Sequence, residues 1–331
     1  MRAAVNTKYG APSVVSVQEI AKPHAGPNDV IVKVKIATVN RTDCGFRSAT
    51  PFIVRGFSGL LKPKHTVLGA EFAGVVDSVG SDVTNFSVGE RVFGYSEFEF
   101  GAHAEYLRMK ADSSIATIPD NLTFEQAAPS TEAAHYALAC IRKAKIKKGQ
   151  DVLVYGATGA IGTAAVQLLK SVGATVTAVC DTDTVDLVSQ LGADRVIDRF
   201  TEDFTKDTSR YDVVFDAVGK SSFGKSSFGK TRHLLRPNGI YVTTDLGTGA
   251  QNPILSLVTP LFGRKKAMLP LPPKFTQELM QTFQELTGSG QFAAVVDRRY
   301  PLDQIVEAYE YVEEGKKVGN VLIVVDPSGS Q

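Results

Sequence analysis

Three glycines near the middle of the chain have the spacing of a turn that binds a dinucleotide. The segment DVLVYGATGAIGTAAVQLLK, residues 151–170, places Gly156, Gly159 and Gly162 between an apolar run and a helical pattern. In such a turn the first glycine permits a tight bend, the second lets the backbone approach a pyrophosphate, and the third allows close packing of helix and strand. The amino terminus of the helix then faces the phosphates. A glycine turn alone is not specific, so the residues around it decide.

An acidic residue follows at the distance that a dinucleotide site requires. The apolar run ATVTAVC ends at Cys180, and Asp181 comes about 20 residues after the last glycine of the turn. A carboxylate at the tip of this second strand is placed to bind the ribose hydroxyls of adenosine. Asp183 adds a second negative charge with no Lys or Arg in the turn, so a 2′-phosphate is repelled. We therefore predict that NAD(H) is preferred over NADP(H), unless both aspartates only begin the following helix.

A second glycine pattern competes with the first. In VFDAVGKSSFGKSSFGKTRHLL, residues 214–235, the phosphate-binding pattern G-x-x-x-x-G-K-[ST] occurs twice, at 219–226 and 224–231. A P-loop needs a helix after it, and a helix extended backward from Pro237 would contain Gly229 at a cost of about 1 kcal/mol. The two copies of KSSFG also account for the pattern as a tandem duplication. A P-loop NTPase is therefore the weaker interpretation.

The composition is that of a globular protein long enough for two domains. The chain has 331 residues, and its formal net charge of +1 does not favour nucleic acid or an anionic membrane as a partner. No apolar run reaches the length of a membrane span. The three cysteines, Cys44, Cys140 and Cys180, are too far apart for a disulfide framework. We expect a cytoplasmic protein that binds small molecules.

Hydrophobic periodicity divides the chain into two kinds of structure. Alternation over 30–39, followed by short apolar runs punctuated by glycine, predicts a small antiparallel β domain in the first third. A capping box at 123–126 opens an alanine-rich helical stretch, after which apolar strands alternate with helices. Such alternation is typical of a parallel sheet covered on both faces. Beyond the proline cluster LPLPPKF the tail is expected to return to the first domain, which makes the α/β part an insertion.

Four segments of the chain resemble the medium-chain dehydrogenase/reductase superfamily. They are VKVKIATVNRTDCGFR, VLGAEFAGVVDSVGSDVTNFSVGERVFG, YGATGAIGTAAVQLLKSVGATVTAV and EEGKKVGNVLIVV. Within the superfamily the chain is most similar to the zinc-independent quinone oxidoreductases and enone reductases. The resemblance implies an α/β fold with a GroES-like β catalytic domain, residues 1–124 and 271–331, and a Rossmann doubly wound parallel-sheet cofactor domain, residues 125–270. We also expect a homodimer that pairs through the edge of the parallel sheet.

The positions that hold zinc in other members carry different residues here. Zinc members have a cysteine ligand three residues before the position of Asp43, where this chain has Asn40, and Gly-His-Glu where it has 69–71, Gly-Ala-Glu. A catalytic zinc needs three protein ligands, so we predict that no metal is bound. The alternative is a regrouped set of Cys44, His65 and Glu71.

The loss of zinc limits the reactions that the site can catalyse. Without a Lewis acid, the interconversion of alcohols and aldehydes loses its main electrostatic stabilisation. A quinone or an α,β-unsaturated ketone spreads the incoming charge over a conjugated system, so hydrogen-bond donors or solvent suffice. We therefore expect an oxidoreductase that transfers hydride from NAD(P)H to such a small conjugated carbonyl substrate. The alternatives are an alcohol dehydrogenase of the same superfamily, a P-loop NTPase and a non-catalytic NAD(P)H-binding protein.

The resemblance also assigns residues to the cofactor. Asn40 is expected beside the nicotinamide ribose and the reaction centre, unless it only caps the following turn. Asn320 stands where relatives often have Lys, which removes a charge that could have reached a phosphate. The remaining expected contacts come from the glycine turn, from the strand tips and from the acid after the second strand: Gly156, Ala157, Thr158, Gly159, Ala160, Ile161, Asp181, Val218, Gly219, Asp245 and Leu246.

Proton delivery has no distinctive sequence pattern. Tyr95 is the predicted catalytic candidate, with His135 and Tyr136 as alternatives, although aromatic residues generally serve packing. Glu132 would bind ribose or a polar substrate group if it faces the pocket. Residues 47–64, RSATPFIVRGFSGLLKPK, are predicted to form a substrate lid, because structureless loops of this length tend to be functional.

Overall fold

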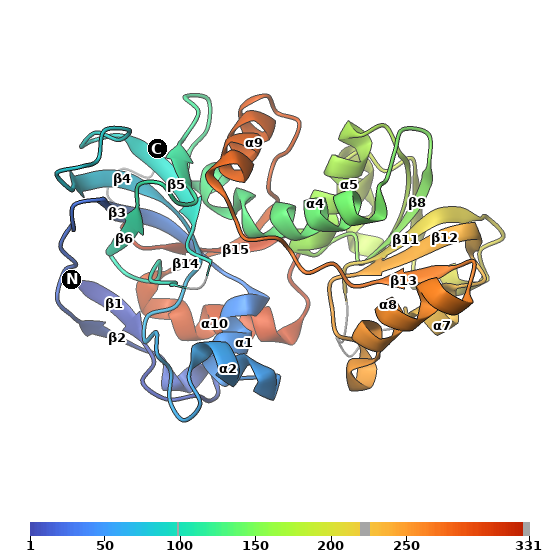
Figure 1. Ribbon diagram of the computed structural model, residues 1–331, viewed down its shortest axis with the longest axis horizontal. Helices are drawn as coiled ribbons and strands as arrows, with labels where there is room; N and C mark the ends of the chain where they lie inside the picture. Colours follow the sequence, from blue (N-terminus) through green and yellow to red (C-terminus); the bar gives the residue numbers. More distant parts are fainter. Residues whose placement is uncertain (98, 219–225, 327–331) are drawn as a thin grey trace. The chain divides into compact units, whose positions relative to one another are not determined.

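The structure is a computed structural model that describes residues 1–97, 99–218 and 226–326 (Figure 1). The chain forms two compact units, unit 1 with residues 1–132 and 275–331, and unit 2 with residues 133–274. The boundaries predicted from the sequence, 124/125 and 270/271, lie a few residues earlier. The segment that ends at Glu132 joins unit 1 because the backbone N–H groups of Thr131 and Glu132 donate to the carboxylate of Glu71.

Unit 1 is built on a seven-stranded sheet with the strand order β14-β15-β3-β4-β5-β7, and β6 pairs with β3. All of its pairs are antiparallel except β14 with β15. A separate two-stranded sheet joins β1 to β2. The strands are β1 (Arg2–Val5), β2 (Ser16–Glu19), β3 (Asp29–Val39), β4 (Glu71–Val79), β5 (Arg91–Tyr95), β6 (Tyr106–Lys110), β7 (Ile115–Thr117), β14 (Val296–Pro301) and β15 (Asn320–Val324).

The core of unit 1 follows from the alternation in β3. Val30, Val32 and Val34 are fully buried, and they pack with the apolar face of α10 in one cluster. Lys33 and Lys35 alternate with these valines, and both pair with Asp326. The helices of unit 1 are η1 (Pro12–Val14), α1 (Arg41–Ser48), η2 (Phe52–Val54), α2 (Arg55–Ser58), α3 (Phe124–Ala127), η3 (Ala128–Ser130), α9 (Gln277–Gly288), η7 (Leu302–Gln304) and α10 (Ile305–Glu314).

Unit 2 contains a six-stranded sheet with the order β10-β9-β8-β11-β12-β13, in which every pair is parallel. The chain moves outward from β8 to β10 and then returns to β11 on the other side of β8. Because crossovers between parallel strands are right-handed, this reversal puts the connecting helices on opposite faces, as Figure 1 shows for α5 and α8. The strands are β8 (Asp151–Tyr155), β9 (Thr175–Cys180), β10 (Arg195–Asp198), β11 (Tyr211–Asp216), β12 (Leu235–Thr243) and β13 (Lys266–Met268).

The helices of unit 2 complete the doubly wound arrangement that the alternating pattern predicts, and the predicted fold class is confirmed. α4 begins at Glu132 and runs into unit 2. Among the described ranges, no helix is both long and apolar enough to cross a membrane. The helices are α4 (Glu132–Ala144), α5 (Ala160–Ser171), η4 (Thr182–Thr184), α6 (Val185–Gln190), η5 (Phe204–Lys206), α7 (Phe228–Thr231), η6 (Thr248–Ala250) and α8 (Gln251–Phe262).

Most of the KSSFG duplication lies outside the described residues, and so does Gly219. The part that is described forms the start of α7, where the hydroxyl of Ser227 accepts a hydrogen bond from the backbone N–H of Lys230. This helix spans only Phe228–Thr231. Its length agrees with the limited room that the sequence leaves before Pro237.

We expect Gly162→Ala to destabilise unit 2 and Gly229→Ala to stabilise it. A Cβ at residue 162 would lie 2.0 Å from the carbonyl oxygen of Gly156, and overpacking typically costs about 1–3 kcal/mol. A Cβ at residue 229 meets no atom of the described residues within 4 Å, and alanine in a helix is favoured over glycine by about 0.5–1 kcal/mol. Thermal unfolding measures the two shifts in the free energy of unfolding, and shifts of the same sign would contradict this packing.

Candidate functional site

The glycine turn after β8 gives each of its three glycines a separate role. Gly156 has φ +79°, and a Cβ there would lie 2.1 Å from the side chain of Val218. Gly162 packs α5 directly onto the carbonyl oxygen of Gly156. Around Gly159 the space is open, since the nearest described atom to a Cβ would be 3.9 Å away. These are the tight bend, the close helix packing and the open approach that a pyrophosphate requires.

The amino end of α5 is available to an anion. Gly159 is the residue before the helix, and no side chain of the described residues caps its first turn. The N–H groups of a first helical turn have no partner inside the helix, so they and the helix dipole favour a bound phosphate. Residues 158–161 are half-buried around this end. The geometry therefore suits the expected contacts from Ala157 to Ile161.

The other expected cofactor residues of unit 2 follow the carboxyl ends of neighbouring strands. The parallel register aligns Tyr155 at the end of β8 with Asp216 at the end of β11, and Asp216 with Thr243 in β12. Val218, Asp245 and Leu246 come directly after these ends, on the same edge of the sheet as the glycine turn. In open α/β sheets, this edge at the reversal of strand order is where ligands bind.

Hydrogen bonds hold this edge in place. The carboxylate of Asp216 accepts from the Tyr241 hydroxyl at 2.6 Å and from the Val218 backbone N–H at 3.1 Å. The carboxylate of Asp245 accepts from the Gly247 backbone N–H at 2.6 Å, which commits one of its oxygens to the turn. Both acids therefore shape the backbone beside the expected cofactor site.

Asp181 has a partner that the sequence pattern did not reveal. Arg199, directly after β10, donates from Nη2 to Asp181 Oδ2 at 2.8 Å and from Nε to Oδ1. Asp181 precedes η4 but makes no side-chain cap to it. Its carboxylate therefore binds the arginine and does not cap the helix. The turn itself has no cation, as the sequence indicates, but the neighbouring strand supplies one. The pair could have been predicted from the position of Arg199, which directly follows the next parallel strand.

In unit 1, Asn40 lies between two buried carboxylates. It follows β3, and its side-chain Nδ2 lies 2.7 Å from Glu71 Oε2 and 2.8 Å from Glu132 Oε2. Its backbone N–H donates to Asp43 Oδ2 at 2.8 Å. The side-chain amide of Asn40 therefore links the end of β3 to β4 and to the start of α4, in addition to its position directly before α1.

Glu71 is fully buried and accepts five hydrogen bonds from described residues. Oε1 accepts from the backbone N–H and hydroxyl of Thr131 at 3.0 and 2.8 Å and from the Glu132 N–H at 2.6 Å. Oε2 accepts from the Thr38 hydroxyl at 2.9 Å and from Asn40. These donors satisfy both oxygens of the buried carboxyl group. The sequence could have indicated this residue, because Glu71 is an acid at the start of an otherwise apolar strand.

Glu132 is buried in the same cluster with fewer donors. Its Oε2 accepts from Asn40, and its Oε1 is bonded to the hydroxyl of Thr42. Burial, followed by the nearby charges of Glu71 and Asp43, raises the pKa of Glu132 to about 8. The sequence predicts that Glu132 binds ribose or a polar substrate group if it faces the pocket. In the structure its carboxyl group contacts Asn40 and Thr42.

Two further titratable groups border the cluster. Burial raises the pKa of Asp43 to about 7, although the backbone N–H groups of Asn40 and Gly69 donate to it at 2.8 and 3.0 Å. Burial lowers the pKa of Lys317 to about 8, and the charge of Glu132 counteracts that effect. Lys317 donates to the carbonyl oxygen of Gly319, just before β15. Neither residue was singled out as a site residue from the sequence.

Asn320, the first residue of β15, lies beside this cluster. The register pairs Val321 with Val39, which brings Asn320 to the position next to Asn40. Its Nδ2 donates to the Val295 carbonyl at 3.0 Å, whereas its Oδ1 is buried with no hydrogen-bond partner in the described part of the chain. An unpaired buried oxygen is costly unless a ligand or water satisfies it.

Of the three candidates for proton delivery, Tyr95 is opposite Glu71 in the register of β4 and β5, while His135 and Tyr136 belong to unit 2. Tyr95 is buried at the end of β5, with its ring 5.1 Å from the ring of Phe275. His135 is buried in α4, its Nε2 lies 2.9 Å from the Pro273 carbonyl oxygen, and burial lowers its pKa to about 4. Tyr136 is half-buried beside it. The catalytic role of Tyr95 stays a prediction.

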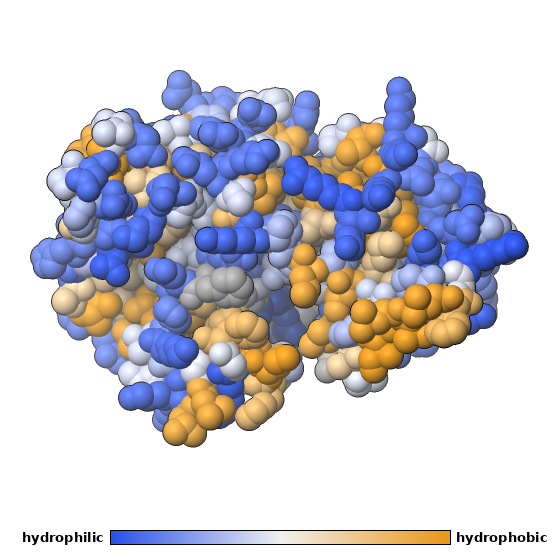
Figure 2. Space-filling view, viewed as in Figure 1, coloured by the Kyte–Doolittle hydropathy of each residue, from blue (hydrophilic) through white to orange (hydrophobic). Residues whose placement is uncertain are grey.

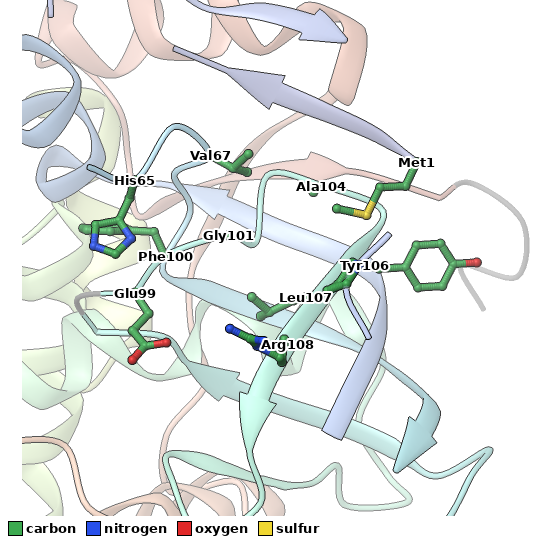
Figure 3. Close-up of a pocket in the computed structure, with 11 residues that line it drawn as sticks. Met1, His65, Val67, Glu99, Phe100, Gly101, Ala104, Tyr106, Leu107 and Arg108 are labelled. Carbon is green, nitrogen blue, oxygen red and sulfur yellow. The ribbon is translucent and has the colours of Figure 1, made fainter. Parts of the chain in front are cut away.

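The regrouped metal set is not assembled in the described residues. No three His, Cys, Asp or Glu side chains among them are arranged to hold a metal ion. Cys44 belongs to the apolar core of unit 1, and Glu71 is taken up by its five donors. His65 lies in a pocket of about 400 Å³ on unit 1, together with Glu99 and Arg108 (Figure 3).

The predicted lid contains two short helices, η2 and α2, rather than an unstructured loop. The hydroxyl of Tyr9 contacts Ser58 and donates to the Gly59 carbonyl, at 2.8 and 2.6 Å. Large apolar side chains of the segment are exposed, namely Phe52, Ile53, Phe57, Leu60 and Leu61. Its role as a lid stays a prediction.

Comparison with known proteins identifies relatives along nearly the whole chain. The family described as "Alcohol dehydrogenase GroES-like domain" matches residues 26–120, and the family described as "Zinc-binding dehydrogenase" matches residues 191–323. A 2-methylene-furan-3-one reductase of Solanum lycopersicum is 30% identical, over 98% of this chain and 79% of its own. An NADPH-dependent alkenal/one oxidoreductase, chloroplastic, of Arabidopsis thaliana is 29% identical over 99% of this chain and 80% of its own.

A solved structure adds the three-dimensional likeness. The quinone oxidoreductase from Coxiella burnetii superposes with a TM-score of 0.84 at 26% identity, covering 98% of this chain and 99% of that one. Sequence similarity thus extends over both units, and it agrees with the four segments from which the family was predicted. The chain is an oxidoreductase that belongs to the medium-chain dehydrogenase/reductase superfamily, in which its relatives include quinone oxidoreductases and enone reductases.

Proposed function

We propose that this oxidoreductase transfers hydride from NAD(P)H to a quinone or an α,β-unsaturated carbonyl compound. The observation that carries the proposal is the turn after β8, where the tight bend, the open approach and the close helix packing fall on three successive glycines. The names of the tomato and Arabidopsis relatives supply the acceptor class. NAD(P)H, when bound, supplies the hydride.

The protein's own residues hold the cofactor and stabilise the charge that the acceptor receives. The turn residues Ala157 to Ile161 and the amino end of α5 bind the pyrophosphate, while Val218, Asp245 and Leu246 line the sheet edge beside it. In unit 1, Asn40 and Asn320 are adjacent, and we assign them to the nicotinamide end, where the buried Oδ1 of Asn320 can accept a hydrogen bond. Tyr95 stays a catalytic candidate on the strength of its position at the end of β5.

We expect the purified protein to oxidise NADH or NADPH with quinones and enones, and to do so equally well in the presence of a chelator. A conjugated acceptor spreads the incoming charge, so its reduction does not require a metal as Lewis acid. Cofactor oxidation is followed by absorbance with quinones, enones and aldehydes. Activity confined to aldehydes and abolished by the chelator would identify a zinc alcohol dehydrogenase instead. NADH binding without any turnover would identify a non-catalytic protein.

We propose further that NADH is preferred over NADPH because of Asp181. Its carboxylate follows β9, where ribose hydroxyls are expected, and the two bonds from Arg199 hold it in one orientation. A 2′-phosphate would have to displace this carboxylate before it could use the arginine. The Arabidopsis relative is NADPH-dependent by name, and that opposite preference is the alternative.

We expect Asp181→Ser to raise the ratio of kcat/KM for NADPH to kcat/KM for NADH by about 10–100-fold. The substitution removes the repulsion and frees Arg199 to form charge-assisted hydrogen bonds to a 2′-phosphate. The double variant Asp181→Ser/Arg199→Gln is the control, and it should lose most of the gain. An unchanged ratio in Asp181→Ser would overturn the role of the aspartate, and a gain retained in the double variant would overturn the role of the arginine.

We propose that the protein forms a homodimer through the edge of the unit 2 sheet. Among the described strands β13 pairs only with β12, which leaves its outer edge open. Next to it, α8 exposes apolar side chains at the spacing of one helix face, and Figure 2 shows apolar side chains gathered over this helix. A second copy would satisfy both features, since an edge strand and an apolar patch are self-complementary about a twofold axis. The exposed side chains of α8 are Ile254, Leu257, Val258, Leu261 and Phe262, and Leu271, after β13, is exposed as well.

We expect Leu257→Glu/Leu261→Glu to halve the molar mass measured by light scattering or sedimentation. Leu257 and Leu261 are each 75% exposed, so the charges cost little in the single subunit but repel across a twofold interface. Lys143→Glu, on the exposed face of α4, is the matched control and should leave the molar mass unchanged. A wild-type protein that is monomeric would contradict the proposal.

We also propose the cytoplasm as the compartment. All three cysteines are free and buried, which suits a reducing environment. The Arabidopsis relative is chloroplastic by name. Localisation of a tagged full-length chain separates these two compartments.

A further inference from the structure

The strongest unassigned feature is the bonded pair formed by Glu132 and Thr42 in unit 1. Glu132 is 5% exposed, while Thr42 at the start of α1 is half-buried. The hydroxyl of Thr42 is bonded to Glu132 Oε1, and Asn40 Nδ2 holds the other carboxyl oxygen at 2.8 Å. Thr42 is therefore the less buried residue of the pair, and its hydroxyl is bonded to the buried carboxyl.

The distribution of donors determines which acid of the cluster carries a proton. Among the described residues, Glu71 accepts five hydrogen bonds, and Asp43 accepts two from the backbone N–H groups of Asn40 and Gly69. Glu132 has one amide donor and one hydroxyl, which can donate or accept. Buried carboxyls this close cannot all ionise at low cost. Asp43 and Glu132 each have two partners in the described part of the chain, and of these only the hydroxyl beside Glu132 can also accept a hydrogen bond from a neutral carboxyl group.

We propose that Glu132 is the proton reservoir of the reaction and that Thr42 is the hydroxyl that passes its proton to the substrate oxygen. This inference rests on the proposed hydride transfer to a conjugated carbonyl. When hydride adds to the β-carbon of an enone, the carbon–carbon π pair shifts and the carbonyl oxygen becomes an enolate oxygen. The Thr42 O–H bond then breaks in favour of that oxygen, and Thr42 Oγ1 takes the proton of Glu132 Oε1. Glu132 is left as a carboxylate, which solvent reprotonates after turnover.

The charges that face Glu132 fit this role. Glu71 on β4 and Asp43 on α1 both favour its neutral form, and Lys317, in the segment before β15, attracts its ionised form. Burial and these acids raise the pKa of Glu132 to about 8, so the group is protonated at neutral pH but can release its proton near that value. A donor whose pKa lies close to the working pH is the most effective general acid.

We expect Glu132→Gln to lower kcat for enone reduction by about 10–100-fold, in line with the loss of a general acid. The wild-type kcat should fall above about pH 8, where Glu132 loses its proton, and this limb should be absent in the variant. The KM for the enone and the affinity for the cofactor, measured by fluorescence, should change little. Glu310→Gln, the same substitution at an exposed position of α10, is the control and should behave like the wild type.

The hydroxyl is tested through its own pair of variants. Thr42→Val should lower kcat as much as Glu132→Gln does, while Thr42→Ser should retain most of the activity. The double variant Glu132→Gln/Thr42→Val should be no slower than either single variant, because both interrupt the same proton path. Additive losses, or equal rates for the valine and serine variants, would overturn the proton path.

A stability measurement tests the proton of Glu132 without any turnover. Its pKa in the folded protein, about 8, lies above the value of about 4.3 for an unfolded chain. The stability that comes from the neutral form is therefore complete at acidic pH and is lost as the pH rises toward 8. The Tm of the wild type minus that of Glu132→Gln should fall over this range and level off above it.

The outcomes separate this inference from the proposed function. A Tm difference that does not change with pH would show that Glu132 holds no proton, even if the enzyme reduces enones. If the wild type failed to oxidise NAD(P)H with any of the quinones or enones, the proposed function would be refuted. The Tm measurement would still decide whether Glu132 is protonated. If Glu132→Gln fails to fold, the Thr42 variants decide the proton path.

Discussion

The buried carboxyl group of Glu71 is the constraint on which the cluster around Asn40 and Glu132 depends. A carboxyl group inside an apolar sheet is tolerated only when hydrogen bonds replace its water. The donors come from the end of β3, from Asn40 before α1, and from Thr131 and Glu132 at the start of α4. Satisfying one buried carboxyl group therefore brings three segments together and sets the orientation of Asn40 and Glu132.

In unit 2 the corresponding constraint is the close contact between α5 and the turn after β8. The absence of side chains at Gly156 and Gly162 allows the helix to begin directly over the strand end. The same contact leaves the first-turn N–H groups of α5 without a side-chain cap from the described residues. The glycine spacing thus serves two purposes, because it permits the close packing and leaves the amino end of the helix open to an anion.

The features that were predicted from the sequence depend on residues that are near each other along the chain. The glycine turn, the alternation in β3 and the alternation of strands with helices are all local patterns, and the predicted architecture is confirmed. The interactions that were missed join residues far apart: Arg199 lies 18 residues from Asp181, and Glu132 lies 90 residues from Thr42. No local pattern encodes such a partner, because the pairing is decided by which strands and helices become neighbours.

The bond between His135 and Pro273 has a consequence for how unit 2 is held in the chain. Since a carbonyl oxygen only accepts, Nε2 of the neutral imidazole carries the hydrogen. The two residues stand just inside the places where the chain enters and leaves unit 2. Their bond closes the unit into a loop whose ends are held together, which lowers the entropy that the ends would otherwise retain. The two ends of unit 2 are therefore held by this hydrogen bond, and protonation of the imidazole would leave Nε2–H donating to the same carbonyl oxygen.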